Sequence, residues 1–99
     1  MLQHIVFFRL TNTSETEKEE IISTLQTKLL ALKDKVDVIK HLECGKNVSN
    51  RAVAYDIALF VSIADENALE QYRIHPAHQK VLEYIKELKP ETAVVDYLT

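Results

Sequence analysis

The stretch Gln3-His4-Ile5-Val6-Phe7-Phe8-Arg9-Leu10 carries apolar side chains at odd and even positions alike. Because neighbouring side chains of a β-strand point to opposite faces, this run predicts a strand that is buried on both faces. One face carries His4, Val6, Phe8 and Leu10, and the other face carries Ile5 and Phe7. A sheet built around such a strand needs a packing layer on each side.

The residues that follow predict alternating helices and strands. Ser14 and Glu17 form a capping box that opens a helix after a polar break at 11–13. Pro76 suits the first position of a later helix, where a missing N–H has no effect. The predicted order is a strand over 3–10, a helix over 14–34, strands over 36–44 and 53–63, a short helix that Asp65 caps, a helix from 76 and a strand over 92–98.

This order of elements favours the α+β class, as a ferredoxin-like βαββαβ sandwich with a four-stranded antiparallel sheet and helices on one face. In the 53–63 strand we expect one face to carry Val53, Tyr55, Ile57, Leu59, Val61 and Ile63. The sheet face without helices would carry Ile5, Phe7, Ala58, Phe60, Val94 and Leu98. A patch of this kind marks an association surface, so we expect residues 1–99 to form one domain that pairs through its sheet as a two-fold dimer.

Composition excludes several classes of protein. The chain has 99 residues, a net charge of −3 and a single cysteine, Cys44. It has no basic stripe for nucleic acid, and no apolar run near the roughly 20 residues that span a bilayer. It opens without a basic leader, and one cysteine cannot form a disulfide within the chain. These features predict a cytoplasmic protein without a nucleic-acid or membrane partner.

The motif Tyr72-Arg73-Ile74-His75-Pro76-Ala77-His78 places three proton-transferring side chains at the start of a helix. His75 is expected to cap that helix, and His78 lies in its first turn. The positive end of a helix disfavours an imidazolium, so we expect a neutral His78 ring that could act as a base or bind a ligand. The alternative is a histidine that only packs and bonds a backbone carbonyl.

The sequence resembles the Dabb family of stress-responsive dimeric α/β-barrel domains. The matching stretches span nearly the whole chain: His4 to Phe8, Gly45 to Val48, Tyr55 to Leu59 and Leu69 to His78. The resemblance implies that two ferredoxin-like subunits pair through their sheets into a barrel, in agreement with the apolar second face.

The resemblance also implies site residues. In a related plant polyketide cyclase, olivetolic acid cyclase, a tyrosine and a histidine of this motif serve an aldol ring closure. They correspond to Tyr72 and His78 here, and a first-strand histidine corresponds to His4. A further pocket histidine falls on Ile57, so part of the polar wall is hydrocarbon in this chain.

We therefore predict a pocket between sheet and helices, lined by His78 and Tyr72 as candidate catalytic residues and by His4, Ile57 and His75 as ligand contacts. Tyr72 and His78 both lie on inward-facing stripes of their helices. The His75 and His78 pair lacks a third ligand in a recognisable pattern, so no metal is expected. A single glycine cannot build a phosphate or dinucleotide loop, so no cofactor is expected either.

Two functions remain open from the sequence. The first is a small-molecule-binding, stress-associated dimer, whose ligand would be hydrophobic or aromatic. The second is a cofactor-free enzyme of the polyketide-cyclase or monooxygenase kind, in which His78 acts as general base and Tyr72 assists it.

Overall fold

The computed structural model describes residues 1–11 and 13–99, and Asn12 of the predicted polar break lies outside the described residues. The elements are β1 (Leu2–Arg9), α1 (Glu15–Leu30), α2 (Leu32–Lys35), β2 (His41–Lys46), β3 (Ile57–Ile63), α3 (Glu66–Ile74), α4 (Pro76–Leu88) and β4 (Glu91–Leu98). The predicted βαββαβ order is confirmed. The short α2 is an added turn that follows a break in the first helix at Ala31.

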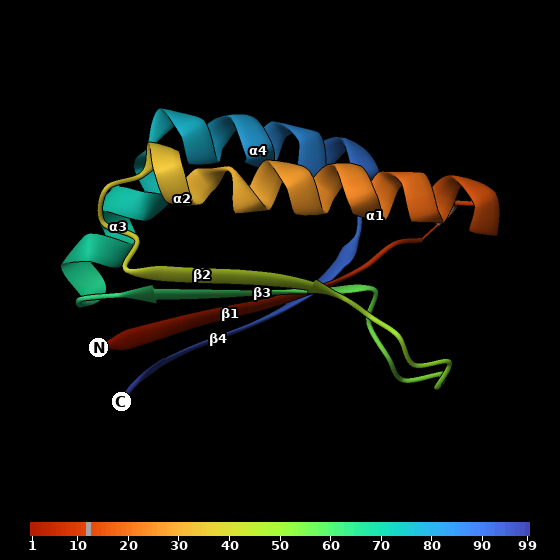
Figure 1. The fold of residues 1–99 in the computed structure, drawn as a ribbon, viewed down its shortest axis with the longest axis horizontal. Helices are drawn as coiled ribbons and strands as arrows, with labels where there is room; N and C mark the ends of the chain where they lie inside the picture. The colour runs from red at the N-terminus through yellow and green to blue at the C-terminus, as the bar shows by residue number, and fades with distance from the viewer. Residues whose placement is uncertain (12) are drawn as a thin grey trace.

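The strands form one antiparallel sheet in the order β2-β3-β1-β4. Helices α1 and α4 run side by side over one face of this sheet, while its other face carries no helix (Figure 1). This confirms the ferredoxin-like sandwich. The two chain ends meet at one edge, where the Thr99 N–H donates to the Met1 carbonyl over 2.9 Å.

The core lies between the sheet and the helices. Ser14 caps α1 by accepting from the Glu17 N–H, as the capping box predicts. The helical stripe continues from α1 into α2, and the strands contribute every second residue. The fully buried members from these elements include Leu25, Leu29, Leu32, Val61 and Ile63.

The second strand starts later than predicted, at His41 rather than residue 36. Val36 and Ile39 are buried, but they lie in a turn, in which the Ile39 N–H donates to the Val36 carbonyl. Their spacing of three residues does not match the period of two in a strand. The predicted start of this strand is wrong because a turn, and not a strand, buries these two apolar side chains.

The third strand also starts later, at Ile57 rather than Val53. Val53 and Tyr55 therefore do not share the buried face of Ile57, and that prediction is wrong. The Tyr55 ring packs on the opposite side of the sheet, 6.1 Å from the Phe7 ring and beneath the Arg9 guanidinium. The predicted alternation reached back beyond the start of β3 because Tyr55, an apolar ring in the matching position, is partly buried by this separate contact.

The register of β4 corrects the apolar sheet face. Ile5 pairs with Val95 and Gln3 with Tyr97, so Val95 and Tyr97 lie on the face without helices. Val94 and Leu98 pair with Val6 and Leu2 and lie on the other face, where β4 extends beyond the helices and leaves both exposed. We call Ile5, Phe7, Ala58, Phe60, Val95 and Tyr97 the outer face.

Candidate functional site

Three of the predicted site residues come together between the sheet and the helices. The ring of Tyr72 lies 4.3 Å from the ring of His78 and 5.7 Å from the ring of His4, measured between centroids. We call His4, Tyr72 and His78 the ring cluster. These residues are brought together from β1, α3 and α4, so the predicted convergence of the three side chains is found.

Local structure explains these positions. Asp65 caps α3 by accepting from the Ala68 N–H at 2.8 Å, and two turns later Tyr72 faces the sheet with no exposed surface. His4 points to the helix-covered side because its neighbours in alternation, Leu2 and Val6, are buried there. His78 lies in the first turn of α4, half-buried against Tyr72.

The Tyr72 hydroxyl is buried and has no hydrogen-bond partner among the residues that the structure describes. Burial, and to a smaller extent the thiol of Cys44, raises the pKa of Tyr72, so the hydroxyl keeps its proton. A buried hydroxyl without a partner destabilises a fold by about 1–3 kcal/mol. It can still donate one hydrogen bond and accept others.

His78 has a defined tautomer. Its Nδ1 lies 3.0 Å from the Arg73 carbonyl oxygen, which can only accept, so Nδ1 carries the proton in the neutral ring. Nε2 then holds the lone pair. Burial lowers the pKa of His78 from its ordinary value, which leaves the ring neutral near pH 7. The alternative, a histidine that only packs and bonds a backbone carbonyl, predicts this hydrogen bond to Arg73. The bond is present, together with the contact between His78 and Tyr72.

Sequence reasoning missed Asp96. The His4 Nδ1–H donates to the Asp96 carboxylate, and the two residues lie directly opposite each other in β1 and β4. A carboxylate at one ring nitrogen fixes the orientation of an imidazole and its tautomer. Asp96 carries no signal in the sequence, because only the β1–β4 register brings it to His4.

The remaining two predicted residues do not belong to the ring cluster. His75 caps α4, with its Nδ1 accepting from the Ala77 N–H at 3.0 Å, so this nitrogen is already occupied. Ile57 pairs with Phe8, whereas Val61 pairs with His4. Four residues of a strand span about 13 Å, so Ile57 does not share a pocket floor with Tyr72.

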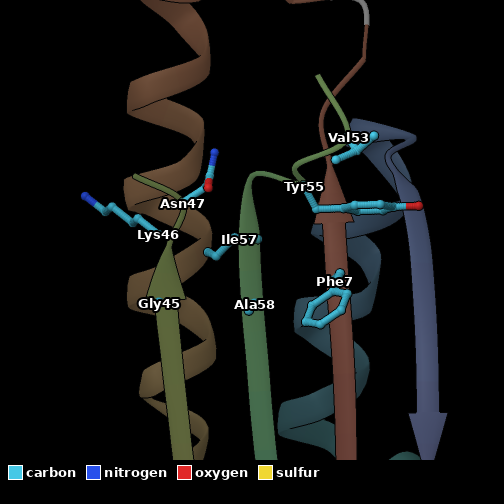
Figure 2. Close-up of a pocket in the computed structure, with 8 residues that line it drawn as sticks. All are labelled: Phe7, Gly45, Lys46, Asn47, Val53, Tyr55, Ile57 and Ala58. Atoms are coloured by element: carbon cyan, nitrogen blue, oxygen red, sulfur yellow. The ribbon is translucent and has the colours of Figure 1, made fainter. Parts of the chain in front are cut away.

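Ile57 instead lines a hollow of about 380 Å³ at the other end of the sheet. Figure 2 shows this hollow where β2 and β3 meet the segment that connects them. Its lining residues are Phe7, Gly45, Lys46, Asn47, Val53, Tyr55, Ile57 and Ala58. None of these belongs to the ring cluster.

Within residues 1–11 and 13–99, no group of three or more His, Cys, Asp or Glu side chains is arranged to hold a metal ion. Burial raises the pKa of Cys44 to about 11, which keeps its thiol protonated and unreactive. No helix in the described part of the chain has both the length and the apolar character to cross a membrane.

Comparison with known proteins gives one consistent result. The family model described as "Stress responsive A/B Barrel Domain" matches residues 2–99. An uncharacterised protein of Streptomyces coelicolor is 32% identical over 79 residues, which are 80% of this chain and 80% of that protein.

Solved structures show the same fold. A dimeric protein of unknown function and ferredoxin-like fold from Bacteroides fragilis is 29% identical, with a TM-score of 0.88 over 99% of this chain and 95% of that one. A dimeric ferredoxin-like protein of unknown function from Thermobifida fusca is 24% identical, with a TM-score of 0.79 over 99% and 90%.

Proposed function

The chain belongs to the stress-responsive A/B barrel domain family (Dabb), and from this premise we propose that it is a homodimer that binds a small hydrophobic or aromatic molecule between sheet and helices. The proposed contacts are Tyr72, His78 and His4, with His75 at the rim. A cytoplasmic location goes with this proposal, because the one cysteine cannot form a disulfide within the chain.

The outer face supports the homodimer. Phe7, Phe60, Val95 and Tyr97 are all exposed in the single chain, and they lie side by side on strands β1, β3 and β4. Adjoining exposed apolar side chains mark association surfaces. The relatives from Bacteroides fragilis and Thermobifida fusca, which share the fold, are dimeric.

The observation that carries the ligand proposal is the buried Tyr72 hydroxyl, which has no partner in the described part of the chain and belongs to a ring that packs near the imidazoles of His4 and His78. Buried polar groups in folded proteins are nearly always hydrogen-bonded. A bound molecule with a hydroxyl or carbonyl group would give Tyr72 its partner, and could also bond Nε2 of His78. Flat rings would pack against the aromatic and imidazole faces.

A fluorescent probe, 2-naphthol, tests this site, because it combines a flat ring with one hydroxyl. Tyr72→Phe keeps the shape of the site and removes only the hydroxyl, so 2-naphthol should bind it several-fold more weakly, up to about tenfold for one hydrogen bond. His78→Ala should weaken binding while light scattering still finds the dimer. Equal affinity for the wild type and Tyr72→Phe would refute the proposed site.

The second candidate function is a cofactor-free enzyme in which His78 acts as general base. The neutral ring with its lone pair on Nε2 favours this function. The base would take a proton from a carbon next to a ketone, and Tyr72 would donate to the enolate oxygen.

Exchange of the methyl hydrogens of acetophenone for deuterium in heavy water, followed by proton NMR, tests this chemistry. We expect the wild type to accelerate the exchange, Tyr72→Phe to slow it and His78→Ala to abolish the acceleration. Exchange at the rate of buffer alone, in a protein that binds 2-naphthol, would leave binding as the function.

A further inference from the structure

The hollow on the outer face has an aromatic and aliphatic lining. Phe7 and Tyr55 provide rings, Ala58 provides a methyl group, and Val53 closes the upper end (Figure 2). Ile57 borders the hollow, but its side chain is buried in the core on the helix-covered side of the sheet. Its volume of about 380 Å³ lies within the range of small-molecule sites, about 300–1,000 Å³. It lies on the opposite side of the sheet from the ring cluster.

The connection between β2 and β3, which walls this hollow, is held in place by specific bonds. Asp56 accepts from the Leu10 N–H at 2.7 Å and donates its own N–H to Phe8 at 2.8 Å. Arg9 donates to the Val53 carbonyl at 3.1 Å, and its guanidinium lies 4.2 Å from the centre of the Tyr55 ring. A wall fixed in advance loses little conformational freedom when a ligand binds.

Gly45, the one glycine of the chain, forms the side of the hollow opposite Ala58. Its φ is not positive, so its backbone conformation does not require glycine. A Cβ added there would meet nothing within 4 Å. Glycine weakens a strand by about 0.5–1 kcal/mol relative to alanine, and within a strand it often marks a close approach by a ligand. The missing side chain at Gly45 leaves the hollow open.

The charged ends of the side chains near the hollow, and the Asn47 amide, already have partners, although the buried Nε of Arg9 has none among the residues that the structure describes. The Lys46 ammonium is turned away and donates to the Ser23 hydroxyl at 2.8 Å (Figure 2). The Asn47 amide both donates to and accepts from the Ser49 backbone, and Arg9 pairs with Glu91. An occupant would therefore find apolar walls without a free charge, which fits a neutral molecule and disfavours an ion.

We propose that this hollow is a second binding site, for a neutral, flat, apolar molecule such as an aromatic ring compound, and that the partner subunit closes its open side. The closure rests on the proposed homodimer, because Phe7 and Ala58 belong both to the hollow and to the outer face. The proposed occupant is a small molecule and not a side chain of the partner subunit. The apolar lining of the hollow, its volume of about 380 Å³ and the absence of an unpaired charge near it among the described residues together fit a ring compound.

N-phenyl-1-naphthylamine, a neutral probe whose fluorescence rises in apolar surroundings, tests the site. We expect it to bind the wild type. Gly45→Leu, whose Cβ would meet no other atom within 4 Å and whose longer side chain would occupy the hollow, should bind it at least about tenfold more weakly. Gly45→Ala should give an intermediate affinity. Tyr72→Phe, altered only at the ring cluster, should bind this probe as the wild type does, and Gly45→Leu should keep the affinity for 2-naphthol.

Light scattering on each variant separates the remaining outcomes. A dimeric Gly45→Leu that has lost the probe supports the proposal. It is overturned if the wild type does not bind the probe, or if Gly45→Leu binds it equally well. It is also overturned if Gly45→Leu becomes a monomer, since the hollow would then receive a partner side chain. If Gly45→Leu does not fold, Ala58→Leu fills the hollow from the opposite side and is measured in the same way.

Discussion

Tyr72 combines complete burial with a hydroxyl that has no hydrogen-bond partner within residues 1–11 and 13–99, and these two properties conflict within a stable core. Removing the hydroxyl should relieve the conflict. We expect Tyr72→Phe to raise the free energy of unfolding by about 1 kcal/mol, as urea denaturation would measure. A gain in stability joined to a loss of 2-naphthol binding would show that this residue serves function at the expense of the fold.

The matched comparison is Tyr84→Phe, because Tyr84 is only partly buried, on α4. That variant should change the free energy of unfolding by less than Tyr72→Phe does. A Tyr72→Phe protein less stable than the wild type would mean that the hydroxyl has a partner in solution.

His78 predicts a pH dependence of stability. Burial lowers its pKa in the folded chain below the ordinary value of 6.5 that it keeps when unfolded. Between these two values the unfolded state binds more protons, so stability should fall as the pH drops below about 6.5 and stop falling beneath the folded pKa. At higher pH the ring is neutral in both states and contributes no slope.

His78→Asn removes the titrating group and places an amide N–H at the position of Nδ1, where it can donate to the Arg73 carbonyl. The difference in unfolding free energy between wild type and His78→Asn should therefore vary with pH only in this window. Denaturation at a series of pH values measures it, and a difference that does not change with pH would contradict the lowered pKa.

At the scale of the element, the start of α4 depends on its cap. His75 accepts from the Ala77 N–H, and Pro76 follows with its φ already near the helical value. His75→Ala should lower the free energy of unfolding by about 1 kcal/mol, while His75→Asn should keep most of the cap. Thermal denaturation compares the two variants.

The same pair of variants tests whether His75 contacts a ligand. If its ring only caps the helix, His75→Asn should bind 2-naphthol as the wild type does. Weaker binding by His75→Asn at unchanged stability would instead support the predicted ligand contact.

At the scale of the whole molecule, the outer face decides the assembly. The wild type should have twice the chain mass of 11.4 kDa in light scattering. Phe60→Asp should produce a monomer, because an unpaired carboxylate buried in the interface costs several kcal/mol.

Leu30→Asp is the control, since Leu30 is 44% exposed and Phe60 39% exposed, but Leu30 lies on helix α1. It should remain a dimer. Dissociation of Leu30→Asp together with a dimeric Phe60→Asp would place the interface on the helices and remove the barrel arrangement.

Patterns of neighbouring residues determined much of this protein in advance. The two-sided apolar run at 3–10 predicted a strand with a layer on each side, and Ser14, Asp65 and Pro76 predicted where helices begin. These signals work because hydrogen bonds and side-chain periods within an element involve residues a few positions apart. The inward direction of Tyr72 and His78 was also predictable, from helical spacing.

Only the tertiary structure decided what depends on register and on contacts between distant segments. Asp96 meets His4 because β4 pairs with β1 in one register, and a shift of one residue would have turned it to the outer face. Tyr55 left the predicted strand because Phe7 and Arg9 hold its ring. The separation of Ile57 from Tyr72, and the hollow beside Gly45, follow from the three-dimensional packing, because distance in the sequence does not fix distance in space.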